Sequence, residues 1–403
     1  MTGHRPRSRV RLAAVLPRRL AAVLPRRLAA VLPRRLAAGA VGPLAALSVT
    51  AVALSGCADF SSSEAAPFSA APEGAETTTT TPPPPTSALP KPKGPCIDQD
   101  PAVIATCLTD PTAVVPTETT EHTYTAQRNG DVYYTTTDEP NQLIVHIPVD
   151  TSGDGGLMSI ALSPHYDEDH LFYAYISTAT DNRVVRVAPG DDPKVILAGI
   201  PRGATGNVGS IMFTSNKTLV VATGNTGDPA AAQNPASLAG KVFAIDSPGT
   251  ITPAHPRILM SGVGSRASLC RDPDGGPLFV AEQGADRDIL RAVSLTGDAP
   301  SVVWTWPDRP GLQGCAVAGQ TIALSETTGP RVEGITLQKD STTATGAPHT
   351  MLGSRYGLIG RLTTGPKGVV EGATRNKGRG KPAPTDDRVV LIPISGAAAD
   401  SPD

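Results

Sequence analysis

The chain has 403 residues, with 40 glycines, 40 prolines, 4% aromatic and 18% charged residues, which excludes a helical bundle and predicts many short, turn-linked strands. Residues 1–56 hold ten arginines and no acid, so the rest has 25 basic against 37 acidic residues, a net charge of −12. A surface this negative repels phosphate backbones and anionic lipid headgroups. The composition therefore predicts no nucleic-acid partner and favours a neutral ligand.

Residues 1–56 have the pattern of a bacterial export signal. The arginine-rich start is followed by an apolar run from Gly39 to Leu54, and residues 54–57 read LSGC, the form of a lipobox. The run is short for a membrane span and contains Pro43. We expect an exported lipoprotein whose Cys57 carries palmitate or similar acyl chains and anchors it to the outer face of the cytoplasmic membrane. The alternative is an uncleaved N-terminal anchor.

Two features surround this signal. Three copies of RLAAVLPR lie within it, each broken by a proline, and we interpret them as a duplication without a function of its own. Residues 57–95 consist almost wholly of Ser, Thr, Ala, Pro and Glu, and include four consecutive prolines at 82–85. Such a segment cannot bury a core, so it predicts a disordered linker with extended, polyproline-like character. Residues 96–120 then lead into the folded domain.

Besides Cys57, four cysteines remain, an even number that favours disulfides in an exported chain. Four cysteines allow three pairings. Sequence proximity favours Cys96 with Cys107, which leaves Cys270 with Cys315 to join neighbouring repeats. No CxxC pair or nearby histidine accompanies them, so a metal site is disfavoured.

Residues 121–398 repeat one pattern six times: an apolar or small segment, a tight turn, then a short β-rich strand. The turns lie near Gly130, Pro164, Asn216, Gly275, Gly319 and Lys367. Further strands are expected at residues 184–187, 241–246, 289–293, 332–337 and 388–392. Turn spacings of 34 to 59 residues suit four-stranded blades and predict an all-β, six-bladed β-propeller. The rival architecture, two tandem β-sandwiches, needs a linker near residue 250, and none is visible there.

Several separated segments, in the same order, resemble motifs of the quinoprotein glucose/sorbosone dehydrogenase family. They are residues 156–164, 223–246, 262–266, 281–284 and 374–389. The mycobacterial lipoprotein of the LppZ type, a shorter exported relative, resembles the chain more closely than the active dehydrogenases do, notably through Gly314-Cys315-Ala316. The resemblance extends over residues 155–394 and implies the same propeller fold.

In active members of the family, pyrroloquinoline quinone (PQQ) lies over the central channel with calcium. A histidine takes the proton of the sugar hydroxyl, hydride passes to the quinone, and arginines hold the quinone oxygens. The resemblance implies that Arg266 and Arg379 bind the cofactor, although arginines bridging adjacent blades are an equal alternative. At the histidine position the chain has Gly206, followed by Asn207 and Val208, so the catalytic base is unassigned.

Two replacement bases come into question. Asp228 opens a loop and Glu282 ends a strand, and a structural role is favoured for both. The sequence therefore leaves two hypotheses: a PQQ-dependent, sugar dehydrogenase-like oxidoreductase acting on aldoses without the usual histidine, or an inactive propeller that serves as a ligand-binding or protein-assembly module in the cell envelope. The expected partners are the membrane through the lipid anchor, a sugar or envelope saccharide, and an envelope protein.

Overall fold

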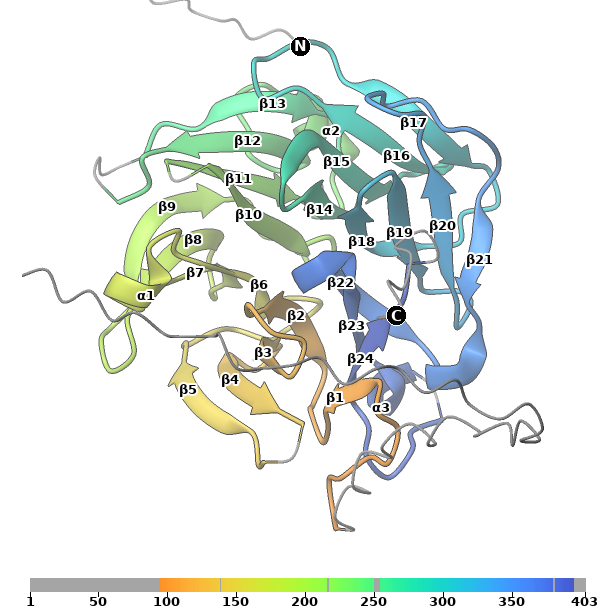
Figure 1. The fold of residues 1–403 in the computed structure, drawn as a ribbon. Helices are drawn as coiled ribbons and strands as arrows, with labels where there is room; N and C mark the ends of the chain where they lie inside the picture. The colour runs from red at the N-terminus through yellow and green to blue at the C-terminus, as the bar shows by residue number, and fades with distance from the viewer. Residues whose placement is uncertain (1–93, 138, 216, 250–253, 380, 395–403) are drawn as a thin grey trace, which may run out of the picture. The chain divides into compact units, whose positions relative to one another are not determined.

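The computed structural model describes residues 94–137, 139–215, 217–249, 254–379 and 381–394. In them, six four-stranded antiparallel sheets surround a central channel as a six-bladed β-propeller (Figure 1). The predicted fold is confirmed, and the tandem-sandwich alternative is wrong. The chain divides into the units Met1–Thr81 and Pro82–Asp403. The export signal, Cys57 and nearly all of the expected linker lie outside the described residues.

Five blades are built from four consecutive strands each, with the innermost strand first. Blade 1 contains β2 (Pro111–Pro116), β3 (His122–Gln127), β4 (Asp131–Thr136) and β5 (Gln142–His146). Blade 2 contains β6 (Leu157–Leu162), β7 (Phe172–Ser177), β8 (Asn182–Val187) and β9 (Lys194–Ile200). Blade 3 contains β10 (Gly209–Ser215), β11 (Thr218–Thr223), β12 (Lys241–Asp246) and β13 (Arg257–Ser261).

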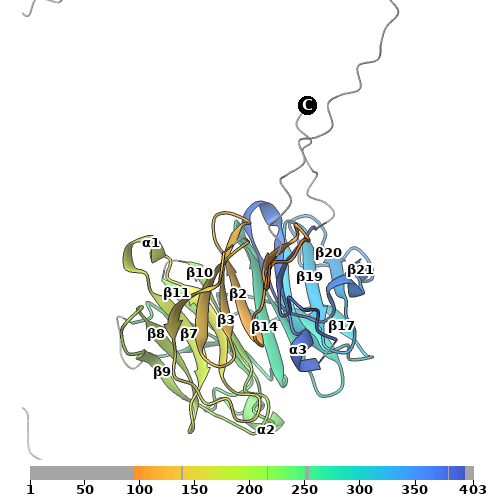
Figure 2. The same ribbon diagram turned by 90° about the horizontal axis from the view of Figure 1, so that it is seen from below.

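Blade 4 contains β14 (Arg266–Asp272), β15 (Gly275–Gln283), β16 (Asp288–Val293) and β17 (Ser301–Trp306). Blade 5 contains β18 (Leu312–Ala318), β19 (Thr321–Glu326), β20 (Val332–Thr336) and β21 (His349–Leu352). Short helices occupy the connections: α1 (Tyr166–Asp169), α2 (Pro229–Gln233), α3 (Asn376–Arg379), η1 (Ser354–Tyr356) and η2 (Pro366–Gly368). Figure 2 shows α1 at one end of the ring and α2 and α3 towards the other.

Blade 6 closes the ring by combining both ends of the domain. Its strands β22 (Ile359–Thr364), β23 (Val370–Thr374) and β24 (Val389–Ile392) are completed on the outside by β1 (Val103–Ala105). Val103 pairs with Val390 in antiparallel register. Because a closed ring leaves no blade without a neighbour, this shared sheet stabilises all the blade interfaces together. The propeller thus extends N-terminal of residue 121, the boundary expected from the repeat.

The expected turns near Pro164, Gly275, Gly319 and Lys367 join the first and second strands of their blades, and Asn216 lies outside the described residues between β10 and β11. Gly130 instead joins the second and third strands of blade 1. The equivalent connection there, residues 117–121, reads TETTE and lacks the glycine, asparagine or aspartate that marks such turns. The expected turn of blade 1 is thus its second turn, whereas those of the other blades are their first turns, which explains why the first turn-to-turn spacing is the shortest.

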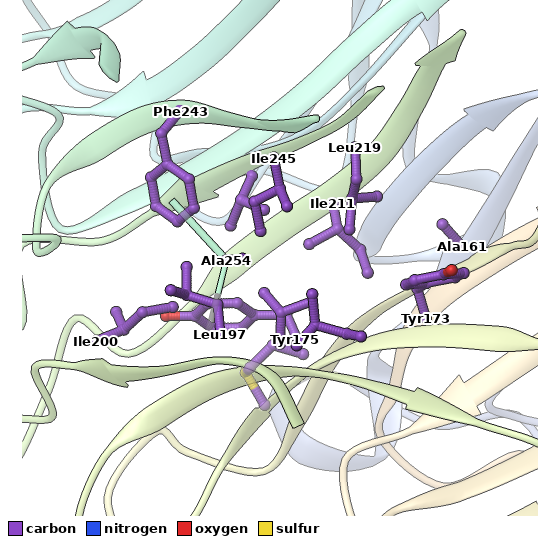
Figure 3. Close-up of a cluster of buried hydrophobic side chains, with 14 of the residues drawn as sticks. Ala161, Tyr173, Tyr175, Leu197, Ile200, Ile211, Leu219, Phe243, Ile245 and Ala254 are labelled. Carbon is purple, nitrogen blue, oxygen red and sulfur yellow. The ribbon is translucent and has the colours of Figure 1, made fainter. Parts of the chain in front are cut away.

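The core consists of apolar layers between neighbouring blades. Between blades 2 and 3, Tyr175 of β7 packs in one buried cluster with Ile211, Leu219 and Phe243 (Figure 3). Each such side chain contributes about 1.5–3 kcal/mol when removed from water. No helix among the described residues is long and apolar enough to cross a bilayer.

Both expected disulfides are confirmed. Cys96 and Cys107 are bonded beside β1, and Cys270 and Cys315 join β14 to β18, the innermost strands of blades 4 and 5. The second bond therefore staples two neighbouring repeats at the wall of the channel.

Candidate functional site

A cavity of about 150 Å³ lies at the end of the channel where the innermost strands begin. The first residues of β2, β14 and β22 line it, together with the loops that precede β6 and β10 and the segment around α3. Its lining consists of Pro111, Thr112, Arg128, Gly153, Asp154, Met158, Val208, Arg266, Gln313, Gly360, Arg361, Arg375 and Arg379. The two arginines expected to bind a cofactor, Arg266 and Arg379, thus come together in one cavity.

Five arginines surround this cavity, three from blade 6 and one each from blades 1 and 4, and two of the five have firm partners. Arg375 pairs with Asp110, and its Nε lies 2.9 Å from the carboxylate. Arg128 donates from Nε to the carbonyl oxygen of Gly155 at 2.8 Å and from Nη2 to those of Thr151 and Gly153 at 2.6 Å. These two arginines shape the rim.

Arg361 and Arg266 are less well matched. Arg361 reaches across the channel from β22, where its Nη2 donates to the carbonyl oxygen of Gly209 at 2.7 Å, while its Nη1 is buried without a hydrogen-bond partner. The guanidinium of Arg266 makes no hydrogen bond or ion pair with any residue that the structure describes. A buried guanidinium with free donors favours a bound anion, because a carboxylate can accept two of its N–H groups at once.

The pKa values reflect this crowding of positive charge. Burial, followed by repulsion from Arg375 and Arg379, lowers the pKa of Arg266 to about 10. Burial and the positive charges of Arg266 and Arg375 lower the pKa of Arg361 to about 9. Both groups remain charged at neutral pH, so an anion in the cavity would relieve their repulsion and restore lost solvation.

Asp154 is the carboxylate that lines the cavity, and it holds the loop containing Gly206. Its oxygens accept hydrogen bonds from the backbone N–H of Gly206 at 2.7 Å, from that of Asn207 at 3.1 Å and from Asn207 Nδ2 at 2.7 Å. Gly206 has a φ of +74°, and a Cβ there would lie 2.8 Å from Thr226 N. The loop therefore has no room for a side chain at this position, and a histidine would require it to move.

The two replacement bases considered from the sequence have structural roles. Asp228 caps α2 by accepting from the backbone N–H groups of Ala230 and Ala231. Glu282 is buried, accepts from Gly264 N at 3.0 Å and pairs with Arg291 Nε at 2.6 Å. Neither residue lines the cavity.

Four charged residues of the site were missed by sequence reasoning: Arg128, Asp154, Arg361 and Arg375. A signal existed for two of them. Arg375 lies in the same motif as Arg379, and Asp154 lies in the glycine-rich turn before β6, which the sequence presents as an ordinary turn. Arg128 and Arg361 stand in no local pattern, and only closure of the ring brings them to the cavity.

A larger cavity of about 560 Å³ lies at the opposite end of the channel, and Arg361 lines both cavities and thus separates them. The charged side chains at this end are hydrogen-bonded to the backbone. Arg271 donates to the carbonyl oxygens of Thr214 and Gly276, and Asp272 accepts from Gly319 N. Across the described parts of the chain, no group of three His, Cys, Asp or Glu residues comes together to hold a metal ion.

Residues 108–294 match the family model described as Glucose / Sorbosone dehydrogenase. No curated protein matches the chain. Among solved structures, the PQQ-bound aldose sugar dehydrogenase of Streptomyces coelicolor is 28% identical, with 72% of this chain and 96% of that chain covered and a TM-score of 0.63. The propeller is therefore related in sequence as well as in structure to aldose sugar dehydrogenases.

Two further structures show the same fold. An oxidoreductase (glucose dehydrogenase) of Thermus thermophilus is 23% identical, covers 72% of this chain and 98% of its own, and has a TM-score of 0.62. The soluble aldose sugar dehydrogenase of Escherichia coli, in its apo form, is 16% identical, covers 72% and 97%, and has a TM-score of 0.57. The similarity spans nearly the full length of each relative.

Proposed function

We propose that this chain is a propeller of the glucose/sorbosone dehydrogenase type that binds PQQ at the arginine-lined cavity and is a weak oxidoreductase on aldose sugars. The observation that carries the proposal is the unmatched positive charge of Arg266 and Arg361. Five arginines face the cavity against the carboxylates of Asp110 and Asp154, a surplus of three positive charges. PQQ carries three carboxyl groups, so its charge complements this surplus.

The size of the cavity limits how such a ligand is held. At about 150 Å³ it is smaller than the roughly 300 Å³ at which ligand pockets usually begin. A cavity of this size would hold only a part of the quinone, such as a carboxylate-bearing edge. Arg266 and Arg361 would hold carboxylate or quinone oxygens, while Arg128 and Arg375, already fixed by their partners, keep the rim in place.

When bound, the quinone supplies a two-electron acceptor for the sugar. The chain's own residues would bind and orient the quinone and the sugar. Gly206 has no side chain that could accept the proton of the sugar hydroxyl. General-base catalysis contributes on the order of 10² to 10⁴ in rate, and this is the deficit we expect relative to an enzyme with a base at that position. Asp154 already accepts three hydrogen bonds from the loop and so serves to position it. Calcium in this site rests on the family resemblance alone.

A second candidate function is favoured by the same loop. Because Gly206 leaves no space for a side chain, the cavity also suits an inactive module that binds a ligand or an envelope protein without turnover. Quinone binding with no sugar oxidation would identify this alternative.

The test is a titration of the mature protein, residues 57–403, with PQQ, followed by dye reduction across a panel of aldoses with and without calcium. We expect saturable binding, weakened in Arg266→Ala and unchanged in Arg271→Gln, whose arginine lies at the opposite end of the channel. Slow turnover abolished by Arg266→Ala supports the oxidoreductase. Absence of PQQ binding in the unaltered protein contradicts both the cofactor and the activity.

We also propose that the protein is an exported lipoprotein anchored through Cys57 to the outer face of the cytoplasmic membrane, in the manner of the LppZ-type lipoproteins. The lipobox-like residues 54–57 support this, and the two disulfides suit an oxidising compartment outside the cytosol. Metabolic labelling with a fatty acid should mark the protein and lose the label in Cys57→Ala. Undiminished label in that variant would refute the anchor.

A further inference from the structure

A groove of about 590 Å³ lies on blades 1 and 2, at the end of the ring opposite the arginine-lined cavity. Its wall is formed by Tyr124 of β3, Tyr134 of β4 and Tyr166 of α1, and its rim carries Glu118, Gln142 and Asp167. Figure 1 shows the strands of blade 1 beside α1 and β7. We call this feature the tyrosine groove.

The aromatic wall is built as a rigid unit. The ring of Tyr124 lies 5.1 Å from that of Tyr134 and 5.5 Å from that of Tyr166, the latter in an edge-on arrangement. Phe172 packs behind both Tyr124 and Tyr166, at 5.5 Å and 5.2 Å. The chain has seven tyrosines, and three of them line this groove with partly exposed rings. Such a wall loses little side-chain entropy when a ligand packs against it.

This chemistry suits a proline-rich segment. Grooves lined by aromatic rings bind polyproline II helices, because proline rings pack against the aromatic faces and the helix is already extended before binding. The exposed carboxylates of Glu118 and Asp167 add a preference for a positively charged ligand flank.

We propose that the chain's own residues 82–93, PPPPTSALPKPK, dock in the tyrosine groove. This segment combines the four consecutive prolines with Lys91 and Lys93, which are the only basic residues between 57 and 95. Its two charges complement those of Glu118 and Asp167. The proposal is independent of quinone binding, which concerns the other end of the channel.

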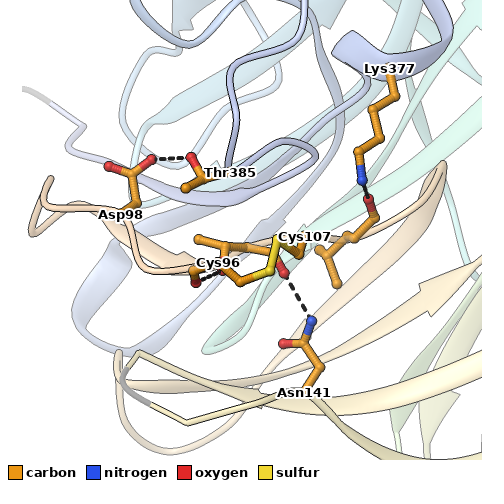
Figure 4. The surroundings of a disulfide bond; sticks show 8 residues. Cys96, Asp98, Cys107, Asn141, Lys377 and Thr385 are labelled. Carbon is orange, nitrogen blue, oxygen red and sulfur yellow. Dashed lines mark hydrogen bonds between the residues drawn. A yellow bond between two sulfur atoms is a disulfide. The ribbon is translucent and has the colours of Figure 1, made fainter. Parts of the chain in front are cut away.

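The first described residues, which follow this segment in the chain, lie close to the groove. The described chain begins at Gly94, and Cys96 is tied to Cys107 by the disulfide (Figure 4). Thr106 Oγ1 donates to the carbonyl oxygen of Cys96, and Asn141 Nδ2 donates to that of Thr106 at 2.9 Å. Asn141 directly precedes Gln142 of the groove. Twelve residues in a polyproline II helix span roughly 37 Å, which is enough to pass around the edge of blade 1.

Docking would fix the N-terminal tether against blades 1 and 2 and so set the direction in which the propeller faces relative to its anchor. A tethered segment has an effective concentration in the millimolar range, so a modest intrinsic affinity suffices to keep the groove occupied.

The experiment measures binding of a fluorescent peptide of residues 80–94 to the mature protein by anisotropy. The unaltered protein, whose groove is self-occupied, should bind the peptide about tenfold more weakly than a variant in which residues 82–85 are changed to glycine. In that variant, adding Tyr134→Ala should abolish binding, whereas Tyr134→Phe, which keeps the ring, should retain it. Asp167→Lys should weaken binding, and a peptide with Lys91→Glu and Lys93→Glu should restore it.

The same peptide with Pro82–Pro85 replaced by alanine is the matched control and should not bind. Equal affinity for the unaltered protein and the variant with glycine at residues 82–85, binding that survives Tyr134→Ala, or no binding at all would overturn the proposal. Neutral oligosaccharides are titrated in parallel. If an oligosaccharide binds at the groove and the peptide does not displace it, the groove is a saccharide site and not the site of the proline-rich segment.

Discussion

The two ends of the central channel differ in how their charged groups are satisfied. At the larger cavity, Arg271 and Asp272 are hydrogen-bonded to backbone groups of neighbouring strands. At the smaller one, Arg361 has a buried Nη1 without a partner, and the guanidinium of Arg266 has no hydrogen bond or ion pair within the described chain. Cavity volume alone would favour the larger cavity as the ligand site. The charged side chains Arg271 and Asp272 there already have hydrogen-bond partners within the chain. The unmatched charge points to the smaller cavity as the site of ligand binding.

The largest expected effect belongs to the disulfide at the larger cavity. Replacing Cys270 and Cys315 together by serine should cost about 2–4 kcal/mol of unfolding free energy, because the bond restricts the unfolded chain. PQQ affinity should stay unchanged, since the bond does not line the arginine cavity. Chemical denaturation and a PQQ titration of the same variant measure both quantities. A loss of PQQ affinity in the same variant would contradict the prediction that the two ends of the channel act independently.

Arg361→Gln should weaken PQQ binding by about 1.5–3 kcal/mol, the range of a hydrogen bond to a charged group. Its guanidinium lines both cavities, so Arg271→Gln is the control that changes the larger cavity alone. Calorimetry in both variants should show the loss in the first only. Similar losses in the two would indicate that the channel responds to total charge rather than to one site.

Glu371 tests whether every unmatched buried group marks a binding site. It is 1% exposed on β23, neither carboxylate oxygen has a hydrogen-bond partner in the described residues, and it lines neither of the channel cavities nor the tyrosine groove. Burial raises the pKa of Glu371 to about 8. We interpret it as a neutral, protonated group at the interface of blades 6 and 1.

The folded pKa of Glu371 lies above the unfolded one, so its stabilising contribution is full below about pH 4.5 and is lost as pH rises towards 8. Unfolding free energy should fall by about 1–3 kcal/mol between pH 5 and pH 8, and Glu371→Gln should remove this part of the slope. Denaturant titrations at several pH values provide the measurement. An unchanged slope in the variant would show that Glu371 is ionised when folded.

The smallest effect is expected at Asp154. Asp154→Asn removes a negative charge beside the anion site and weakens the hold on Gly206, so PQQ should bind a few-fold more tightly while stability falls by about 1 kcal/mol. Thermal unfolding measures the expected loss of stability, and the PQQ titration measures the expected gain in affinity. Weaker PQQ binding would mean that ordering of the loop outweighs charge.

The strands and the repeat could be predicted from the sequence because they depend on residues that are close together in the chain. Third strands at 184–187, 241–246 and 289–293 coincide with β8, β12 and β16, since alternating or continuous apolar runs between turns form strands wherever they occur. The first repeat was placed one strand late, because residues 117–121 turn without a turn signal. The even count of cysteines predicted disulfides, and sequence proximity favoured, among three possible pairings, the one that the structure contains.

What the sequence by itself determined is therefore the six-fold repeat, its local strands and the two disulfides. Only the closed ring decided that Arg128 of blade 1 and Arg266 of blade 4 meet Arg361 and Arg375 of blade 6, because no local pattern relates the three blades. The tertiary structure also decided that Gly206 lacks room for a side chain, since Thr226 and Gly227, some 20 residues away, occupy that space. The local periodicity of apolar residues reflects which side chains are buried. A site depends on contacts across the channel between residues that are distant in sequence.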